Sequence, residues 1–214
     1  IRGYAELALV QEDTLTDYRE MAANTIEESD RLLDMINTML LISKAEIRKD
    51  DFDFEQIHLS GMIAEACELF APLAEDKQIL FETSIDDDLY LMVDVRMLQR
   101  AFSNLLDNAI KYTGHHGMIR VTAYHQSQMA VIEICDTGVG IDPENKEKIF
   151  QRFFRAESSR TSPGAGLGLS LARTIIRRHQ GDIRVVSTPG ISTTETGLDW
   201  KFFRSSPVVY SSNV

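Results

Sequence analysis

Residues 104–113 read Asn-Leu-Leu-Asp-Asn-Ala-Ile-Lys-Tyr-Thr, and this stretch (the Asn104 segment) decides which fold the sequence favours. In a helix, the side chains of Asn104, Asn108 and Lys111 fall on one face, while the aliphatic residues between them supply apolar surface. Two carboxamide oxygens beside an ammonium group suit a hydrated magnesium ion and the phosphates that it bridges. Taken alone, the pattern also fits a solvated helix face or a buried hydrogen-bond network.

Downstream, residues 136–141 read Asp-Thr-Gly-Val-Gly-Ile and directly follow an apolar strand (the Asp136 segment). A carboxylate at the end of a strand can accept a hydrogen bond from an exocyclic amine such as that of adenine. Gly138 and Gly140 would let the backbone approach a flat ring closely. A simple turn that ends the strand would have the same sequence, so this alternative stays open.

Residues 149–155 read Ile-Phe-Gln-Arg-Phe-Phe-Arg within a long loop rich in glycine and charge (the Arg155 segment). Apolar anchors such as Phe150, followed by an arginine, suit a lid whose charge reaches a phosphate. A surface turn with its phenylalanines packed inward is the alternative, so the functional prediction depends on Arg155 alone.

The fourth stretch, residues 164–170, reads Gly-Ala-Gly-Leu-Gly-Leu-Ser and opens a helix (the Gly166 segment). The free N–H groups of a helix start, surrounded by glycines, form a favourable site for an anion. The segment lacks the Gly-Lys-Ser/Thr of a Walker A loop and does not form a βαβ dinucleotide fingerprint. Protein-kinase signatures such as a catalytic HRD are also absent from the chain.

The residues between these segments predict an α+β fold, a two-layer α/β sandwich with a mixed sheet and helices on one face. We expect helices at about 60–74, 97–112 and 167–178, with Ser60 as a cap and Gly181 as a C-cap. The expected strands are 57–59, 79–83, 89–93, 118–124, 129–135, 183–186 and 200–203.

A separate helical region precedes this sandwich. Residues 16–45 contain no Gly or Pro and repeat apolar residues at helical spacing. We interpret residues 1–48 as a truncated helical hairpin that pairs with a second copy of the chain, and a single long connector helix is the alternative. The full division is hairpin 1–48, linker 49–54, a main α+β domain 55–204 and a poorly ordered tail 205–214.

Composition narrows the class of protein further. The formal net charge of −11 makes nucleic acid an improbable partner, because phosphate backbones repel such a surface. Cys67 and Cys135 form no CxxC pair, which fits a reducing cytoplasm. No apolar run is long enough to cross a bilayer. Because Ile1 already has the pattern of a helix interior, we expect a piece of a longer protein with any membrane segment upstream.

In this order the four segments resemble the N, G1, F and G2 boxes of sensor histidine kinases of two-component systems, whose ATP-binding domain belongs to the superfamily of gyrase, HSP90 and MutL. The resemblance covers about residues 54–203. It implies ATP and Mg²⁺ as cofactors, with Asn108 as the magnesium ligand and Asn104, Lys111 and Arg155 as further catalytic residues. It also implies a set of nucleotide-contacting residues: Asn108, Lys111, Tyr112, Asp136, Gly138, Gly140, Ile141, Phe150, Gly164, Gly166, Leu167, Gly168 and Leu169.

The resemblance also implies a reaction and a partner. The γ-phosphate of ATP would pass to a histidine and then to the receiver domain of a response regulator. Ile1–Leu7 resembles the stretch after the family's acceptor histidine, which would therefore lie upstream, so we expect this chain to bind ATP without autophosphorylating. This portion would be cytoplasmic and its parent anchored in the membrane.

Besides the missing acceptor histidine, the chain departs from the family in one more place. Gly190 and Gly197 are spaced unlike the family's last glycine motif, which leaves the register of the closing strand open. A gyrase-like ATPase, an anti-sigma serine kinase and a scaffold that has lost its nucleotide are the rival functions. Related hydrolases carry a glutamate where this chain has Asn104, and an amide cannot act as that base. Hydrolysis of ATP should therefore be slow.

Overall fold

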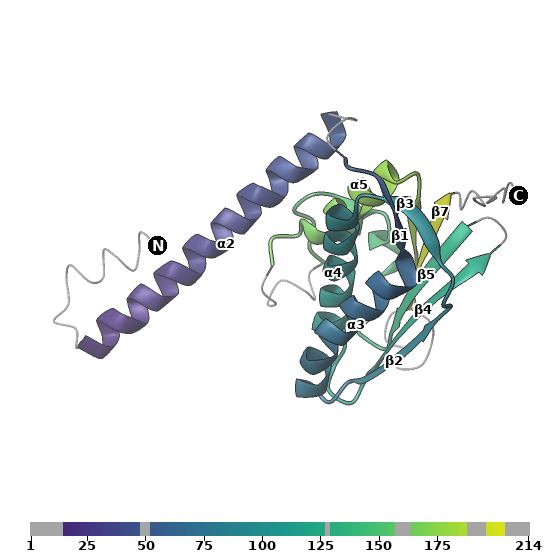
Figure 1. Cartoon of the computed structure of the whole chain (residues 1–214). Coiled ribbons are helices and arrows are strands. Elements are labelled where there is room, and N and C mark those ends of the chain that lie inside the picture. The colour runs from purple at the N-terminus through teal and green to yellow at the C-terminus, as the bar shows by residue number, and fades with distance from the viewer. Residues whose placement is uncertain (1–14, 48–51, 127–128, 157–163, 188–195, 204–214) are drawn as a thin grey trace, which may run out of the picture.

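The computed structural model of the chain describes residues 15–47, 52–126, 129–156, 164–187 and 196–203 (Figure 1). A long helix, α2 (Leu15–Ile47), precedes a sheet that has one face covered by three helices. These are α3 (Leu59–Asp76), α4 (Val95–Tyr112) and α5 (Gly168–Arg178). The α+β class expected from the sequence is confirmed by this arrangement.

The main sheet has five strands in the order β2, β4, β5, β7 and β6. Strand β2 (Leu80–Ile85) runs parallel to β4 (Met118–Gln126), while β4 pairs antiparallel with β5 (Met129–Asp136). Strand β7 (Thr196–Phe203) pairs antiparallel with both β5 and β6 (Asp182–Val186), so the sheet is mixed. The closing strand thus lies inside the sheet, with Trp200 opposite Ile132, and β6 forms the edge.

A second, two-stranded sheet joins β1 (Glu55–His58) to β3 (Tyr90–Val93) in antiparallel register. Helix α3 (Leu59–Asp76) follows β1 directly, and the Leu59 amide donates to Leu89 O at 2.7 Å. Two short 3-10 turns, η1 (Pro143–Asn145) and η2 (Lys148–Phe150), follow the Asp136 segment.

The core lies between the sheet and α3, α4 (Val95–Tyr112) and α5 (Gly168–Arg178). Residues that alternate along β4 and β5, such as Val121 and Ile132, are buried on the helical side. Phe102, Leu105 and Leu106 of α4 are completely buried against them. Each such side chain contributes roughly 1.5–3 kcal/mol of transfer free energy, so this layer fixes where α4 lies.

The start of α4 is set by Asp94, which is buried and accepts a hydrogen bond from the Met97 amide at 3.1 Å. This is the N-cap contact that satisfies one of the free donors of a helix start. At the other end, the Lys77 ammonium donates to Ile110 O at 2.9 Å. Both ends of α4 are therefore held by residues outside the helix.

Two predicted caps are wrong. Ser60 does not cap α3, which starts one residue earlier with His58 as its N-cap. The buried Ser60 hydroxyl instead donates to Asp86 O at 2.5 Å and accepts from the Leu89 amide at 3.2 Å, tying α3 to the turn before β3.

Gly181 is not the C-cap of α5, because that position is His179. Gln180 then takes the left-handed conformation, with φ of 62°. The amides of Gln180 and Gly181 donate to Arg177 O and Ile176 O, which is the double hydrogen bond of a Schellman motif.

Helix α2 (Leu15–Ile47) is mostly exposed, and only its C-terminal part packs on the rest of the chain. Ile42 and Ala45 are buried, the Arg178 guanidinium donates to Ala45 O, and Arg100 donates to the Thr38 hydroxyl at 3.3 Å. The predicted first arm of a hairpin and the tail 205–214 lie outside the described residues. In the described part of the chain, no helix is both long and apolar enough to span a bilayer.

Candidate functional site

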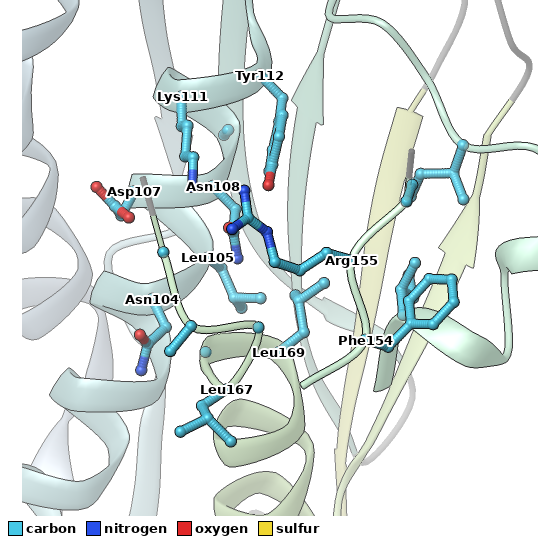
Figure 2. A pocket seen from close by; sticks show the side chains of 18 of the residues that line it. Asn104, Leu105, Asp107, Asn108, Lys111, Tyr112, Phe154, Arg155, Leu167 and Leu169 are labelled. Carbon is cyan, nitrogen blue, oxygen red and sulfur yellow. The ribbon is translucent and has the colours of Figure 1, made fainter. Parts of the chain in front are cut away.

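A cavity of about 390 Å³ opens between α4, the loop after β5, the segment before α5 and the inner face of α2. Residues from all four sequence segments line it, including Asn108, Asp136, Arg155 and Gly166. Figure 2 shows that Asn104, Asn108, Lys111 and Tyr112 reach it from one helix, opposite Arg155. The volume lies within the range of sites for small ligands.

The α4 wall carries the amide and ammonium groups. Asn104 Nδ2 donates to Arg100 O at 2.9 Å, which fixes the orientation of the carboxamide beside Gly168. The Lys111 ammonium lies 5.3 Å from the centroid of the Tyr112 ring and close to Gly164. The wall therefore presents both carboxamides and one cation to the same space.

The opposite end of the cavity is a fixed loop after β5. Asp136 Oδ1 accepts from the Gly138 amide at 2.8 Å, and the Val139 amide donates to Tyr112 O at 3.3 Å. A Cβ on Gly138 would lie 2.5 Å from Tyr112 O, so only glycine allows this approach. Further along, the Ile141 amide donates to the Ser187 hydroxyl at 2.8 Å.

Asp136 is an unusual carboxylic acid. Burial raises the pKa of its carboxyl group above the ordinary value for aspartate, and the hydrogen bond from the Gly138 amide lowers it in part. A half-buried carboxylate at the end of a cavity can accept a hydrogen bond from a ligand amine in surroundings that favour ligand over water.

The Gly166 segment forms the floor. Gly166 has φ of 70°, and its carbonyl accepts from the Phe153 amide at 2.9 Å. Helix α5 begins two residues later, at Gly168, and its N-cap, Leu167, makes no side-chain cap hydrogen bond. The first amides of α5 have no intrahelical acceptor, and the helix dipole favours negative charge at this point.

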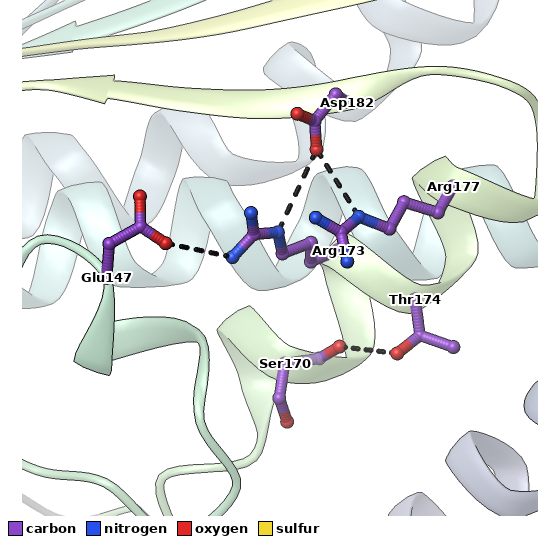
Figure 3. A network of polar contacts seen from close by, with 6 residues as sticks. All are labelled: Glu147, Ser170, Arg173, Thr174, Arg177 and Asp182. Carbon is purple, nitrogen blue, oxygen red and sulfur yellow. Dashed lines mark hydrogen bonds and ion pairs between the residues drawn. The ribbon is translucent and has the colours of Figure 1, made fainter.

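The Arg155 segment is anchored on α5. The Arg173 guanidinium lies 4.4 Å from the Phe150 ring centroid and forms ion pairs with Glu147 at 3.7 Å and Asp182 at 3.8 Å (Figure 3). Arg177 contacts the Asp182 carboxylate as well, at 3.5 Å. This network fixes the start of the segment, while Arg155 itself lines the cavity.

Every residue that the sequence predicted for the site lines this cavity except Phe150 and Gly138. Phe150 packs under Arg173, and Gly138 lies against Tyr112 O, where it allows the loop to approach α4. The neighbours Ile149 and Phe154 line the cavity in place of Phe150. Their position inside the Arg155 segment was the available signal.

Sequence reasoning also missed a wall supplied by α2. Arg31, Asp34, Met35 and Thr38 all line the cavity, and so does Asp107 of α4. The helical spacing of these α2 residues predicted a helix, but which face of that helix packs on the rest of the chain depends on tertiary contacts that no local pattern reveals.

The oxygen donors that line the cavity suit a magnesium ion that is coordinated partly by the protein and partly by a bound small molecule. Among the described residues, no three His, Cys, Asp or Glu side chains gather as a metal cluster. Magnesium keeps several waters and is commonly bound through few protein oxygens plus substrate phosphates. The Asn108 carboxamide lies on the cavity side of α4, where it could supply one such oxygen.

The family model described as "Histidine kinase-, DNA gyrase B-, and HSP90-like ATPase" matches residues 93–201. Drug sensory protein A of Synechocystis is 36% identical over 82% of this chain and 28% of its own length. The chain spans 28% to 50% of the curated relatives with which we compared it.

Solved structures agree with this match. The catalytic domain of histidine kinase ThkA has a TM-score of 0.60 and 30% identity, covering 71% of this chain and 97% of that domain. ThkA in complex with response regulator protein TrrA has a TM-score of 0.67 and 28% identity, covering 92% of this chain and 53% of that one.

Proposed function

This chain belongs to the histidine kinase-, DNA gyrase B- and HSP90-like ATPases, and within them to the sensor histidine kinases, and from that premise we propose that it binds ATP with Mg²⁺ and presents the γ-phosphate to a histidine. The observation that carries the proposal is the single cavity that residues of all four sequence segments line.

We define two ends of this cavity. The base end consists of Asp136, Val139, Gly140 and Ile141, and the phosphate end consists of Asn104, Asn108, Lys111, Arg155 and the start of α5. Asp136 would accept the adenine amine. Lys111, Arg155 and the α5 amides would orient the phosphates, and positioning with charge neutralisation is most of what phosphoryl transfer requires. Magnesium held by Asn108 would neutralise charge on the phosphates.

The acceptor is proposed to be a histidine outside this chain. The chain has five histidines, at positions 58, 115, 116, 125 and 179, and none of them is in α2. His179 is buried and bonded to Ile175 O and the Asp94 amide, which leaves its ring no access to a phosphate. With Asn104 in place of a carboxylate base, water should compete poorly for the phosphate.

We further propose a homodimer and a response regulator as partners. Ile26, Leu33, Ile36 and Leu40 of α2 are all more than half exposed and recur at helical spacing, as expected for a helix that pairs with another. The ThkA–TrrA complex supports a receiver domain as the second partner. The division into hairpin 1–48 and catalytic domain 55–204, a cytoplasmic location and a membrane-anchored parent belong to the same proposal.

The experiment that tests this function uses a longer version of the protein that includes the residues before Ile1. Incubated with γ-labelled ATP and Mg²⁺, it should acquire label that is acid-labile and base-stable, as phosphohistidine is. Asn108→Ala should remove the label, while Asn145→Ala, outside the cavity, should keep it. Rapid release of free phosphate without any labelled protein would instead favour an ATPase.

A further inference from the structure

Helix α2 closes one side of the nucleotide cavity. Arg31, Asp34, Met35 and Thr38 follow one another at the i, i+3, i+4 and i+7 spacing of a single helix face, and all four line the cavity. The same face continues into Ile42 and Ala45, which are buried against the rest of the chain. The apolar residues proposed for dimerisation lie elsewhere on the helix and remain exposed.

Specific contacts hold α2 in this position. The Arg178 guanidinium of α5 donates to Ala45 O, which is one of the carbonyls that a helix end leaves without an intrahelical donor. Arg100 of α4 donates to the Thr38 hydroxyl at 3.3 Å. These contacts, together with the burial of Ile42, dock α2 on the two helices that form the phosphate end.

The docked face lies at the phosphate end of the cavity. Thr38 is bonded to Arg100, and the carbonyl of Arg100 in turn accepts from the Asn104 carboxamide. Arg31 is seven residues before Thr38, or roughly 10 Å along the helix axis. The residues of the base end come from β5 and the loop that follows it.

We propose that Arg31 is a further phosphate-binding residue of the nucleotide site and that it acts while α2 is docked; this rests on the proposed binding of ATP. The Arg31 side chain is 43% exposed, and it forms an ion pair with Glu28 of the same helix at 3.9 Å. Such exposed pairs contribute little, so the guanidinium can turn to a phosphate at small cost. Its planar donors match two phosphate oxygens at once.

The charges of the neighbouring residues explain why a further cation at the phosphate end would strengthen the binding of phosphates. Asp34 and Asp107 also line the cavity and repel phosphates, while Lys111 and Arg155 attract them. Arg31 gives the cations a majority at this end. If Arg31 binds the terminal phosphates, ATP stabilises the docked position of α2, and docking in turn strengthens the binding of ATP.

The test compares nucleotide affinities of the unaltered chain and its variants with Mg²⁺ present. Arg31→Ala should raise the Kd for ATP about tenfold, as expected for a lost hydrogen bond between charged groups, and change the Kd for AMP less than about twofold. The Kd of Arg31→Lys for ATP should lie between those of the unaltered chain and Arg31→Ala. Arg19→Ala, on the same helix but outside the cavity, should leave both constants unchanged.

Docking is tested by a second change. Arg178→Ala should reproduce part of the ATP-specific loss, and its combination with Arg31→Ala should cost less than the sum of the two. Thermal unfolding confirms that each variant folds.

An Arg31→Ala protein that binds ATP as tightly as the unaltered chain overturns this inference, and so does an equal loss for ATP and AMP. If the unaltered chain itself binds no ATP, the proposed function fails first.

Discussion

The two ends of the cavity are built in different ways. The base end is one continuous stretch, Asp136–Ile141, whose backbone is bonded to Tyr112 O and the Ser187 hydroxyl. The phosphate end is assembled from α4, the start of α5 and the Arg155 segment, and α2 supplies a further wall of the cavity. A short rigid loop is suited to recognise a flat ring of fixed shape. Separate helices can change their mutual position when a charged ligand arrives or leaves.

The largest effect is expected at the phosphate end. Asn108→Ala removes the carboxamide that we propose as the magnesium ligand and should weaken binding of ATP about 100-fold in Mg²⁺. In EDTA the variant and the unaltered chain should differ little, because no metal is bound. Calorimetric titration measures both, with Asn145→Ala as the matched control. Equal affinities in Mg²⁺ would remove Asn108 from the metal site.

At the base end, the loss should not depend on the number of phosphates. Asp136→Asn removes a charged hydrogen-bond acceptor and should weaken ATP, ADP and AMP alike, by about tenfold. Because burial raises the pKa of Asp136, the unaltered chain should lose affinity at a higher pH than an ordinary aspartate would allow. Asp136→Asn should lack this acid-side loss. A loss of affinity confined to ATP would mean that Asp136 does not bind the adenine ring.

The floor between the two ends is tested by Gly166→Ala. A Cβ at this position would lie 2.7 Å from Phe154 O, and its φ of 70° disfavours other residues. The change should lower the free energy of unfolding by about 1 kcal/mol or more. Urea unfolding measures it, and Gly114→Ala, which meets open space, is the control. Equal stabilities would show that the floor rearranges freely.

The smallest effect concerns the helices behind the phosphate end. Burial lowers the pKa of His179, which joins the C-terminus of α5 to the start of α4. The unfolded chain therefore binds more protons just below about pH 6.5, and stability should fall as the pH drops through that value. Urea unfolding at about pH 7.5 and about pH 5.5 should show a smaller change for His179→Gln. An equal change would assign the pH dependence to other groups.

The two ends also differ in how far the sequence reveals them. The base end is contiguous, so the order of Asp136, Gly138 and Gly140 after an apolar strand predicted that these residues lie together. The contact of Asp136 with an adenine amine stays a prediction. Much of the phosphate end was also visible, since Asn104, Asn108 and Lys111 share one face of a helix. The helices and the mixed sheet followed from periodicity.

The features that the sequence concealed all depend on tertiary packing. The sequence allowed Phe150 to line the cavity or to pack on the core, and the structure shows it packed against the core and under Arg173. Ser60 had the chemistry of a cap, yet the neighbouring turn at Asp86 takes its hydroxyl. Which face of α2 meets α4 and α5 depends on partners more than fifty positions away in the sequence, such as Arg100 for Thr38.

Calorimetric titration of the unaltered chain with ATP tests the central claim most directly. The account predicts saturable binding of one nucleotide per chain in Mg²⁺, and binding at least about tenfold weaker when EDTA removes the metal. A titration without saturable heat, in a chain shown by its thermal transition to be folded, would contradict it.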